Sequence, residues 1–503
     1  MKPFTGIFLS LLCSAFLTVA QTPVDTAFIY TFGGKGNDIC NQIRPAADNG
    51  FILIGTTSSF GAGNTSMYAV KTDANCHHLW SKTYGGAQIQ AGLAVVPTID
   101  KGFAFLGYTT SFGNGGYDVY LVKTDSIGNL EWQKTYGGPD WDFGYSLKQT
   151  HDGGFIICGQ TYSYGAGNGD VYLIRTTALG DTLWTHTYGG SGYDTGNSIL
   201  LQGDSLYTIA GATTSFGKGD TNIYFLQVDT NGLLKNTRTF GCSRNSVAYC
   251  IAPEYDRGYL LFGSMDSITP GIRGQVLIKT DYSGNLIWML PPNASPYQDF
   301  GKEVTEAPDH TYLCSSAADG GGYGSSSLLV THLDSSGAWL AGPSIGGNNN
   351  QYGNSVTIGS NRNVLFAGET SSWGMGDFDA LVVRFKTDSI VQVYYLAVTS
   401  FADTSLPAAG IPTNSLPAPG VRVSPNPLVT ETSFLLQTQT PDQYTLSLYD
   451  ASGASVATPI PFVRTGNGQA LIHLQRGALP KGVLLYEIKD AGQTVGSGKL
   501  IVE

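Results

Sequence analysis

The sequence predicts an all-β protein, namely a seven-bladed β-propeller of four-stranded blades followed by a small C-terminal β-sandwich. Three observations support this. A tetrapeptide of the Tyr-Gly-Gly type recurs at a period of 52 residues. Each period holds four short strand-like runs and no helical periodicity. The 503 residues include 66 glycines and 12% aromatic residues but only 13% charged ones, a composition typical of short strands joined by glycine turns.

The repeat can be followed through its most constant tetrapeptide. The copies begin at Thr31 (TFGG), Thr83, Thr135 and Thr187 (TYGG), and Thr239 (TFGC), so each step is 52 residues. The next clear copy, SIGG at Ser344, follows 105 residues after the fifth. That distance leaves room for one degenerate copy, so seven copies account for residues 31–399.

Within a copy, the four runs read as antiparallel strands. In the third copy they are YSLKQT, GFIICGQT, VYLIRTT and LWTHTYGG. A single four-stranded unit leaves both faces uncovered, so the units must stack to bury their apolar residues. We expect the repeated tryptophans (Trp80, Trp132, Trp184, Trp288) to pack between units, TDSIGN to form a tight turn, and the Tyr-Gly-Gly glycines to supply positive φ. A parallel β-helix would need shorter coils, of roughly 20–30 residues.

The ring must also close on itself. The stretch DTAFIYTFGG, residues 25–34, resembles the end of a copy without its beginning. We therefore predict that it supplies the fourth strand of the last blade, which is expected to begin at Ser344.

The connections between strands are expected to divide between two faces of the ring, because alternate loops of an up-and-down sheet lie on the same side. The short turns HDGG and TDSIG define a short-turn face, and the longer connections SYGAGNGD and YGGSGYDTG define a long-loop face. Only the long-loop face is predicted to be large enough for a ligand site. Its candidate ligand-binding residues are Tyr117, Asp118, Trp141, Asp142, Asp170, Tyr193 and Asp194, with Asp220, Asp377 and Asp379 in the same loops.

Aromatic rings beside carboxylates suit sugars, because a ring stacks on the sugar face and a carboxylate accepts hydrogen bonds from hydroxyl groups. Carboxylates with backbone carbonyls would equally suit calcium, which stays open as a ligand; no other cofactor is predicted. The alternative for every Asp is a turn-forming role. The aromatic residues that recur in phase, Phe60, Phe112, Tyr164 and Phe216, are predicted to pack against their own blades.

Catalytic motifs are missing from the sequence. It contains no GxSxG, HExxH, Walker or dinucleotide-binding pattern, so a non-enzymatic role is the leading interpretation. A hydrolase or lyase acting on polysaccharide remains an alternative, since carboxylates are plentiful. The formal net charge of −11 argues against nucleic acid as a partner. We expect a monomer.

The N-terminus predicts export. Residues 1–20 combine Lys2, a short apolar run (residues 7–17) and small residues before a cut between Ala20 and Gln21, as in a signal peptide. No later segment is apolar enough to span a membrane. Six cysteines then remain. Cys158 and Cys314 lie in apolar strands and should be buried, whereas Cys242 and Cys250 are near enough in sequence for a disulfide.

The composition changes after the repeats. Residues 21–398 are assigned to the propeller, 399–420 to a linker rich in Pro, Ala and Ser, and 421–503 to a β-sandwich, where runs such as YTLSLYD alternate apolar and polar residues.

Two resemblances add to this interpretation. The repeat DGGFIICGQTYSYGAGNGDVYLIRTT resembles those of secreted propeller proteins of Bacteroidetes-type bacteria, most of which have no assigned activity. The spacing of Asp125, Gly128 and Trp132 looks like the docking motif of quinoprotein-type propellers. The adjacent cysteines expected near a quinone are absent, so no quinone is predicted.

The last residues resemble the C-terminal sorting domain of the type IX secretion system. The matching motifs are SPNP (Pro425, Asn426, Pro427), LYD with Gly453, LPKG (Gly482) and KLIV (Lys499). The resemblance implies export through the type IX machinery and a secreted or outer-membrane-surface protein. Combined with the loops, it suggests a binding or adhesion module for a glycan or a surface protein. A purely structural surface component is the third possibility.

Overall fold

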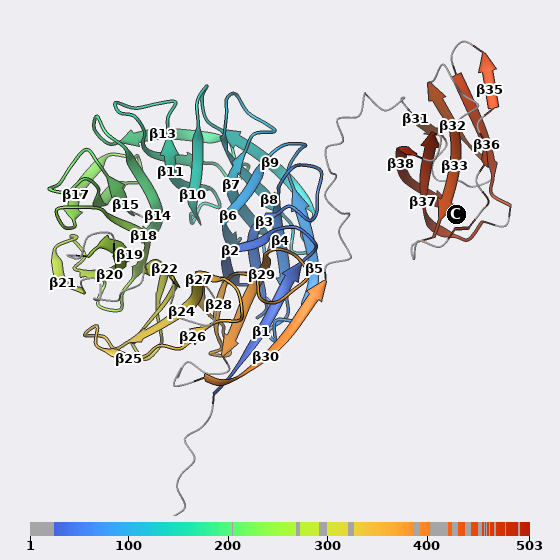
Figure 1. Ribbon diagram of the computed structural model, residues 1–503. Coiled ribbons are helices and arrows are strands. Elements are labelled where there is room, and N and C mark those ends of the chain that lie inside the picture. Colours follow the sequence, from blue (N-terminus) through green and yellow to red (C-terminus); the bar gives the residue numbers. More distant parts are fainter. Residues whose placement is uncertain are drawn as a thin grey trace, which may run out of the picture. The chain divides into compact units, whose positions relative to one another are not determined.

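The computed structural model describes residues 25–203, 205–267, 272–290, 299–319, 326–385 and 393–402, and between 421 and 502 the strands named below with adjoining turns. The chain divides into two compact units, Met1–Ile411 and Pro412–Glu503 (Figure 1). Every regular element described is a β-strand, so the all-β prediction is confirmed. Across these residues there is no helix long and apolar enough to cross a membrane.

The first part of the chain forms four-stranded antiparallel sheets in chain order. Their strands are β2 (Asp38–Pro45), β3 (Phe51–Thr57), β4 (Ser66–Thr72) and β5 (His78–Tyr84); β6 (Gln90–Pro97), β7 (Phe103–Thr109), β8 (Asp118–Thr124) and β9 (Leu130–Tyr136); β10 (Asp142–Gln149), β11 (Phe155–Thr161), β12 (Asp170–Thr176) and β13 (Thr182–Tyr188); and β14 (Asp194–Gln202), β15 (Leu206–Thr213), β16 (Asn222–Asp229) and β17 (Leu234–Phe240).

The pattern continues in the later copies with irregularities. The next sheets contain β18 (Ser246–Pro253), β19 (Tyr259–Asp266), β20 (Arg273–Thr280) and β21 (Leu286–Leu290), then β22 (Asp299–Glu306), β23 (Tyr312–Asp319), β24 (Ser326–Leu333), β25 (Trp339–Ala341) and β26 (Ser344–Ile345). The sheet that closes the ring contains β27 (Gln351–Ile358), β28 (Val364–Thr370), β29 (Asp379–Phe385), β1 (Asp25–Gly33) and β30 (Val393–Ala402).

These sheets follow one another around a ring, which is a propeller-like arrangement (Figure 1). The first strand of each sheet faces the centre and contacts the first strands of its neighbours. Asparagine side chains tie them together. Asn41 Nδ2 donates to Gly92 O at 2.8 Å, and Asn354 Nδ2 donates to Cys40 O at 3.0 Å, which links the last sheet to the first.

The recurring KTDSIGN…TYGG stretch joins neighbouring sheets. Asp125 Oδ1 accepts the backbone N–H groups of Ile127 and Asn129, and Gly128 has φ of 78°, as the predicted tight turn requires. The Tyr84 hydroxyl of the preceding sheet donates to the carbonyl of Gly128 at 2.8 Å. A Cβ on Gly128 would lie 2.9 Å from the Trp80 ring. The prediction that the repeated tryptophan packs between units is confirmed here.

The expectation of positive φ at the Tyr-Gly-Gly glycines is only partly correct. Gly85 has φ of 140°, but Gly137 does not have positive φ. Gly137 is needed for a different reason. A Cβ there would lie 2.5 Å from Asp118 Oδ1 and 2.7 Å from Asp142 Oδ2, so two carboxylates occupy the space that a side chain would fill.

The predicted closure of the ring is confirmed, but the predicted start of the last blade at Ser344 is wrong. Ser344 lies in β26, which pairs with β24 of the preceding sheet, and the closing sheet starts with β27. Strand β1 pairs antiparallel with β29, in a register that places Ala27 opposite Phe385 and Phe32 opposite Ala380. The sequence did not predict a fifth strand, β30, which pairs parallel with β1. Its last residues extend into the range 399–420 that was assigned to a linker.

The six cysteines among the described residues of the first unit are free. Cys158 and Cys314 are fully buried in strands, as expected. The disulfide considered between Cys242 and Cys250 is not formed. Cys242 lies in the loop before β18, near Ser246, whereas Cys250 is buried on β18 with its sulfur toward the Val304 carbonyl.

The second unit contains two four-stranded sheets. Their strands are β31 (Val421–Ser424), β32 (Glu431–Gln437), β36 (Gln469–Gln475) and β35 (Val463–Gly466), and β34 (Ile460–Pro461), β33 (Tyr444–Tyr449), β37 (Gly482–Asp490) and β38 (Gln493–Val502). One apolar cluster includes Phe434 and Ile472 of the first sheet and Leu446 and Leu484 of the second. Gly482 lies at the start of β37 and Lys499 in β38. Ala20, Gln21, Pro425–Pro427 and Gly453 lie outside the described residues.

Candidate functional site

The long connections lie together at one end of the strands, as predicted. Backbone hydrogen bonds join each long loop to the next. Asp142 N donates to Tyr117 O at 2.7 Å, and Tyr162 N donates to Trp141 O at 2.8 Å. Asp194 N and Gly169 O make the equivalent contact one repeat later, at 2.8 Å. This scaffold fixes the loop backbones and thereby the side chains they carry.

A continuous group of aromatic side chains lies on this face around the starts of β8, β10 and β14. We call it the aromatic cluster, and its members are Tyr108, Tyr117, Trp141, Phe143, Tyr145, Tyr162 and Tyr193. Tyr117 contacts Tyr108 and Phe143 at ring-centroid distances of 5.3 Å, and Trp141 at 5.7 Å. Tyr162 continues the contacts to Trp141 at 6.1 Å and to Tyr193 at 6.3 Å.

The outer members of the cluster are open to solvent. Trp141 is 53% exposed, Tyr193 is 50% exposed and Tyr162 is 37% exposed. Burial raises the pKa of Tyr162 above its usual value, with Tyr193 adding to the effect. A tyrosine hydroxyl is protonated near neutral pH and can donate a hydrogen bond. The exposed rings offer flat apolar surfaces with polar edges, which is the equipment needed to stack on a sugar ring and bond its hydroxyl groups.

A glycine makes room for the tryptophan. A Cβ on Gly116 would lie 2.4 Å from Trp141 Cδ1 and 2.5 Å from its Nε1. The equivalent repeat positions carry Asn64 and Asn168, so this copy departs from the pattern where the indole lies. Gly116 therefore positions Trp141.

The predicted carboxylates have a different role from the aromatic residues. Asp118, Asp142, Asp170 and Asp194 are no more than 2% exposed. Asp142 Oδ2 accepts the N–H of Gly138 and the hydroxyl of Ser163, each at 2.7 Å.

The other carboxylates are held in similar ways. Asp170 Oδ2 accepts hydrogen bonds from the backbone N–H groups of Ala166 and Gly167. Asp194 Oδ2 accepts one from the N–H of Gly190 and one from the Ser215 hydroxyl. Asp118 Oδ2 accepts one from the N–H of Gly115. Asp379 is buried in the same way, whereas Asp220 and Asp377 are exposed. Of the predicted candidates, the structure thus brings together Tyr117, Trp141 and Tyr193, and assigns the four buried Asp residues to loop stabilisation.

Sequence reasoning missed Tyr108, Phe143, Tyr145 and Tyr162. A signal was present, because each is aromatic where several other copies have a small, aliphatic or polar residue. Tyr162, for example, corresponds to Ser58, Thr110 and Thr214. Trp141 and Tyr193 likewise share a repeat position, at which other copies have Asn37, Ile89 and Asn245.

The in-phase aromatic residues pack as expected. Phe60, Phe112, Tyr164 and Phe216 lie with ring centroids 5.6–5.9 Å from Tyr68, Tyr120, Tyr172 and Tyr224 of their own sheets. Phe60 is buried, and the other three are partly exposed.

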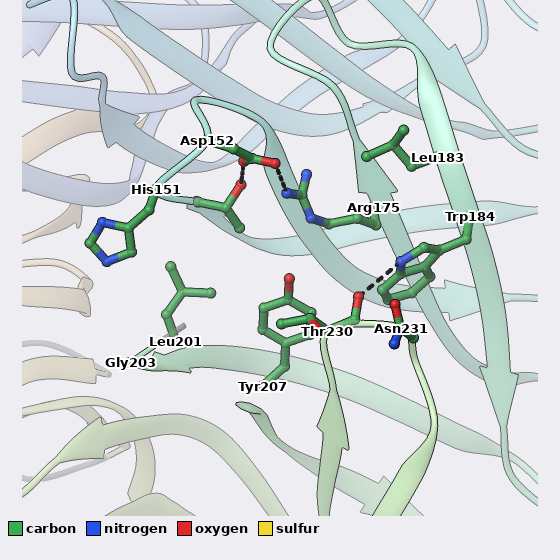
Figure 2. Close-up of a pocket in the computed structure, with 11 residues that line it drawn as sticks. His151, Asp152, Arg175, Leu183, Trp184, Leu201, Gly203, Tyr207, Thr230 and Asn231 are labelled. Atoms are coloured by element: carbon green, nitrogen blue, oxygen red, sulfur yellow. Dashed lines mark hydrogen bonds and ion pairs between the residues drawn. The ribbon is translucent and has the colours of Figure 1, made fainter. Parts of the chain in front are cut away.

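The prediction that only the long-loop face can host a site is wrong. A cavity of about 400 Å³ lies beside the short turns, between the turn at Thr150–Asp152 and the turn at Thr230–Asn231 (Figure 2). Its main polar groups are paired with one another. Asp152 bonds Arg175 at 2.6 Å, and Trp184 Nε1 donates to Thr230 O at 3.1 Å. The first contact lies within one sheet and the second joins it to the next sheet, so these polar groups serve the scaffold and the aromatic cluster is the better candidate.

Metal ligands do not gather in the described part of the chain, where no group of three or more His, Cys, Asp or Glu side chains is arranged to hold an ion.

No protein-family model matches the sequence, and no curated protein matches it. Solved structures are similar at low identity. Sqt1 from Chaetomium thermophilum is 12% identical, with a TM-score of 0.40 over 69% of this chain and 81% of that one. The β-propeller domain of the Trilobed protease from Pyrococcus furiosus is 9% identical, with a TM-score of 0.40 over 73% and 97%. YCF48 bound to a D1 peptide is 10% identical, with a TM-score of 0.39 over 73% and 96%. Similarity at this level bears on neither ligand nor activity.

Proposed function

We propose that this protein is an exported, non-enzymatic binding module whose aromatic cluster holds a glycan. The observation that carries the proposal is the contiguity of the cluster, with Trp141, Tyr162 and Tyr193 exposed side by side on rigid loop backbones. Three exposed rings in a row match successive sugar units better than a single small ligand. Exposed aromatic groups of this kind are also unusual without a partner.

The architecture proposed with this function is a seven-bladed propeller, each sheet of the first unit being one blade, followed by a β-sandwich. Five four-stranded sheets, the five-stranded sheet in which β26 pairs with β24 beside β25, and the five-stranded closing sheet support the count. The shared apolar cluster of the two C-terminal sheets supports the sandwich.

The cellular location is proposed from the sequences of the two termini. The signal-like residues 1–20 and the ordered motifs near Pro425, Gly453, Gly482 and Lys499 support export by the type IX route to the cell surface or the medium. The sorting domain would be removed on the way. Intact-mass analysis of the external protein checks this, and a mass that includes residues 421–503 would contradict it.

Two alternatives remain for the same face. A hydrolase or lyase would need carboxylates that reach the substrate, but the loop carboxylates Asp118, Asp142, Asp170 and Asp194 are buried and bonded to their own loops. A structural surface component, or a module that binds another surface protein, would use the same exposed aromatic residues without a glycan.

The test is an array of polysaccharides and glycans probed with the purified chain, in calcium and in chelator, with released products measured in the same wells. We expect saturable glycan binding without products. Trp141→Ala should weaken it at least about tenfold, as loss of a stacked aromatic anchor does. Trp339→Ala is the matched control, since Trp339 is 67% exposed but lies on the outer strand β25.

A second variant tests positioning. Gly116→Asn introduces the residue that other copies have at this position, yet it would displace the indole of Trp141. It should therefore weaken binding without removing an aromatic group. Released products would favour the hydrolase or lyase. A blank array, or equal binding by wild type and Trp141→Ala, would overturn the glycan proposal.

A further inference from the structure

The first strands of the sheets enclose a second cavity at the centre of the ring. Its volume is about 720 Å³, and it is lined by residues of β2, β6, β10, β14, β18, β22 and β27. Cavities of roughly 300–1,000 Å³ are the size that small organic ligands occupy. Every sheet of the first unit contributes to it, so its lining is determined by the whole ring.

The charge of this cavity is opposite to that of the chain. The protein has a net charge of −11, but the charged side chains that line the cavity are Arg44, Lys148, Lys302 and Glu303. Three cations against one carboxylate leave an excess of two positive charges in a confined space. Within the described residues, no other lining side chain of this cavity is acidic.

The single carboxylate of the cavity, that of Glu303, is bonded to neighbouring protein groups. Glu303 forms an ion pair with Arg44, and it also accepts hydrogen bonds from the Ser355 hydroxyl and the backbone N–H of Val356, the latter at 2.9 Å. This network fastens β22 to β2 and β27. It pairs Arg44 with Glu303, and among the described residues neither lysine forms an ion pair with that carboxylate.

The two lysines are thus left without a strong partner in the cavity. In the part of the chain that the structure describes, the Lys148 ammonium forms neither a hydrogen bond nor an ion pair. The Lys302 ammonium lies over the ring of Tyr249, 5.1 Å from its centroid. Burial lowers the pKa of both groups. Arg44 adds to the effect at Lys148, whereas Glu303 partly opposes it at Lys148 and Glu369 partly opposes it at Lys302.

Such amines are stabilised by an anion that enters the cavity. Tyr145 and Tyr249 also line it and offer apolar surface beside the lysines. We propose that the central cavity is a binding site for a small organic anion, a carboxylate or a phosphate ester on a sugar-sized skeleton, held by Lys148 and Lys302. This site is distinct from the glycan surface proposed above, although Tyr145 contributes to both.

The test is calorimetric titration of the purified chain with glucuronate and with glucose 6-phosphate, with glucose as the neutral probe. We expect one or both anions to bind and glucose not to bind. The preferred anion shows whether the carboxylate or the phosphate ester is the natural chemistry. Lys148→Met should weaken anion binding at least about tenfold. Lys134→Met is the control, because Lys134 lies on β9 in an exposed ion pair with Asp181.

A second readout separates binding from folding. Lys148→Met removes an unpaired, partly buried charge, so the unliganded variant should melt no lower than wild type while losing the rise in melting temperature that the anion gives. If Lys148→Met does not fold, the test uses Lys302→Met, which should also lose anion binding. Failure of both anions to bind at millimolar concentration, equal binding of glucose, or undiminished binding by the folded lysine variant would overturn the proposal. Loss of glycan binding in Trp141→Ala would leave this result unaffected.

Discussion

The junctions between neighbouring sheets use the same two repeat positions but differ in charge. At three junctions two carboxylates flank a glycine: Asp38 and Asp379 at Gly33, Asp118 and Asp142 at Gly137, and Asp170 and Asp194 at Gly189. At two others the flanking groups are neutral: Asn222 and Ser246 at Gly241, and Ser327 and Gln351 at Gly346.

The comparison shows that the scaffold does not need the charge. Asp38 Oδ2 accepts the N–H of Gly34 at 2.7 Å, and at the equivalent position Gln351 Oε1 accepts the N–H of Gly347 at 2.9 Å. A neutral amide therefore organises the loop as a carboxylate does. Where two carboxylates meet, burial and mutual repulsion disfavour the charged form.

The largest effect is expected at the ring closure. Burial raises the pKa of Asp379 to about 6, and the Asp38 carboxylate adds to this. The folded-state pKa of Asp379 lies above its unfolded-state value, so ionisation of this group destabilises the folded protein. The loss of stability is complete above about pH 6 and disappears as the pH falls below about 4. Asp379→Asn should therefore stabilise the protein at pH 8, by an amount on the order of 1–3 kcal/mol.

Thermal unfolding at pH 8 and at pH 4 checks this prediction. The melting temperature of Asp379→Asn should exceed that of wild type at pH 8, and the difference should nearly vanish at pH 4. An equal difference at both pH values would mean that packing, and not ionisation, is the cause.

Smaller gains are expected at the other acidic junctions. Burial raises the pKa of Asp118, with Asp142 adding to it, and raises that of Asp170 with a contribution from Asp194. Asp118→Asn and Asp170→Asn should each raise the melting temperature at pH 8, by less than Asp379→Asn does. The same pair of pH values serves for the measurement. A loss of stability in both variants would show that these carboxylates are needed for their loops.

The smallest effect is expected when a carboxylate is introduced into a neutral junction. Gln351→Glu keeps the acceptor for Gly347 N and faces Ser327, not a second carboxylate. Because burial remains but the second carboxylate is absent, we expect the variant to lose stability at pH 8 by less than Asp379→Asn gains. A loss comparable with the gain in Asp379→Asn would show that burial alone, without pairing, accounts for the difference between junctions.

Much of the fold could be predicted from the sequence because the repeat defines equivalent positions in successive copies. The tight turn at Asp125, the packing of Trp80 and the closing role of residues 25–34 all follow from the 52-residue period and from strand chemistry. The added strand β30 could not be predicted, since Val393–Ala402 has no counterpart in the repeat. The burial of Asp142 and Asp194 was also missed, because the sequence does not show which loop amides lie close enough to bind a carboxylate.

The sequence by itself determined the strands, their period and the way the chain closes, because alternation, turn residues and spacing are local properties of the chain. Only the tertiary structure decided which side chains meet. Tyr108, Trp141 and Tyr193 come from different copies and become neighbours only when adjacent sheets stack. The charges of the central cavity likewise come from strands more than a hundred residues apart, Lys148 on β10 and Lys302 on β22. Such contacts depend on the ring as a whole, and no single stretch of sequence contains them.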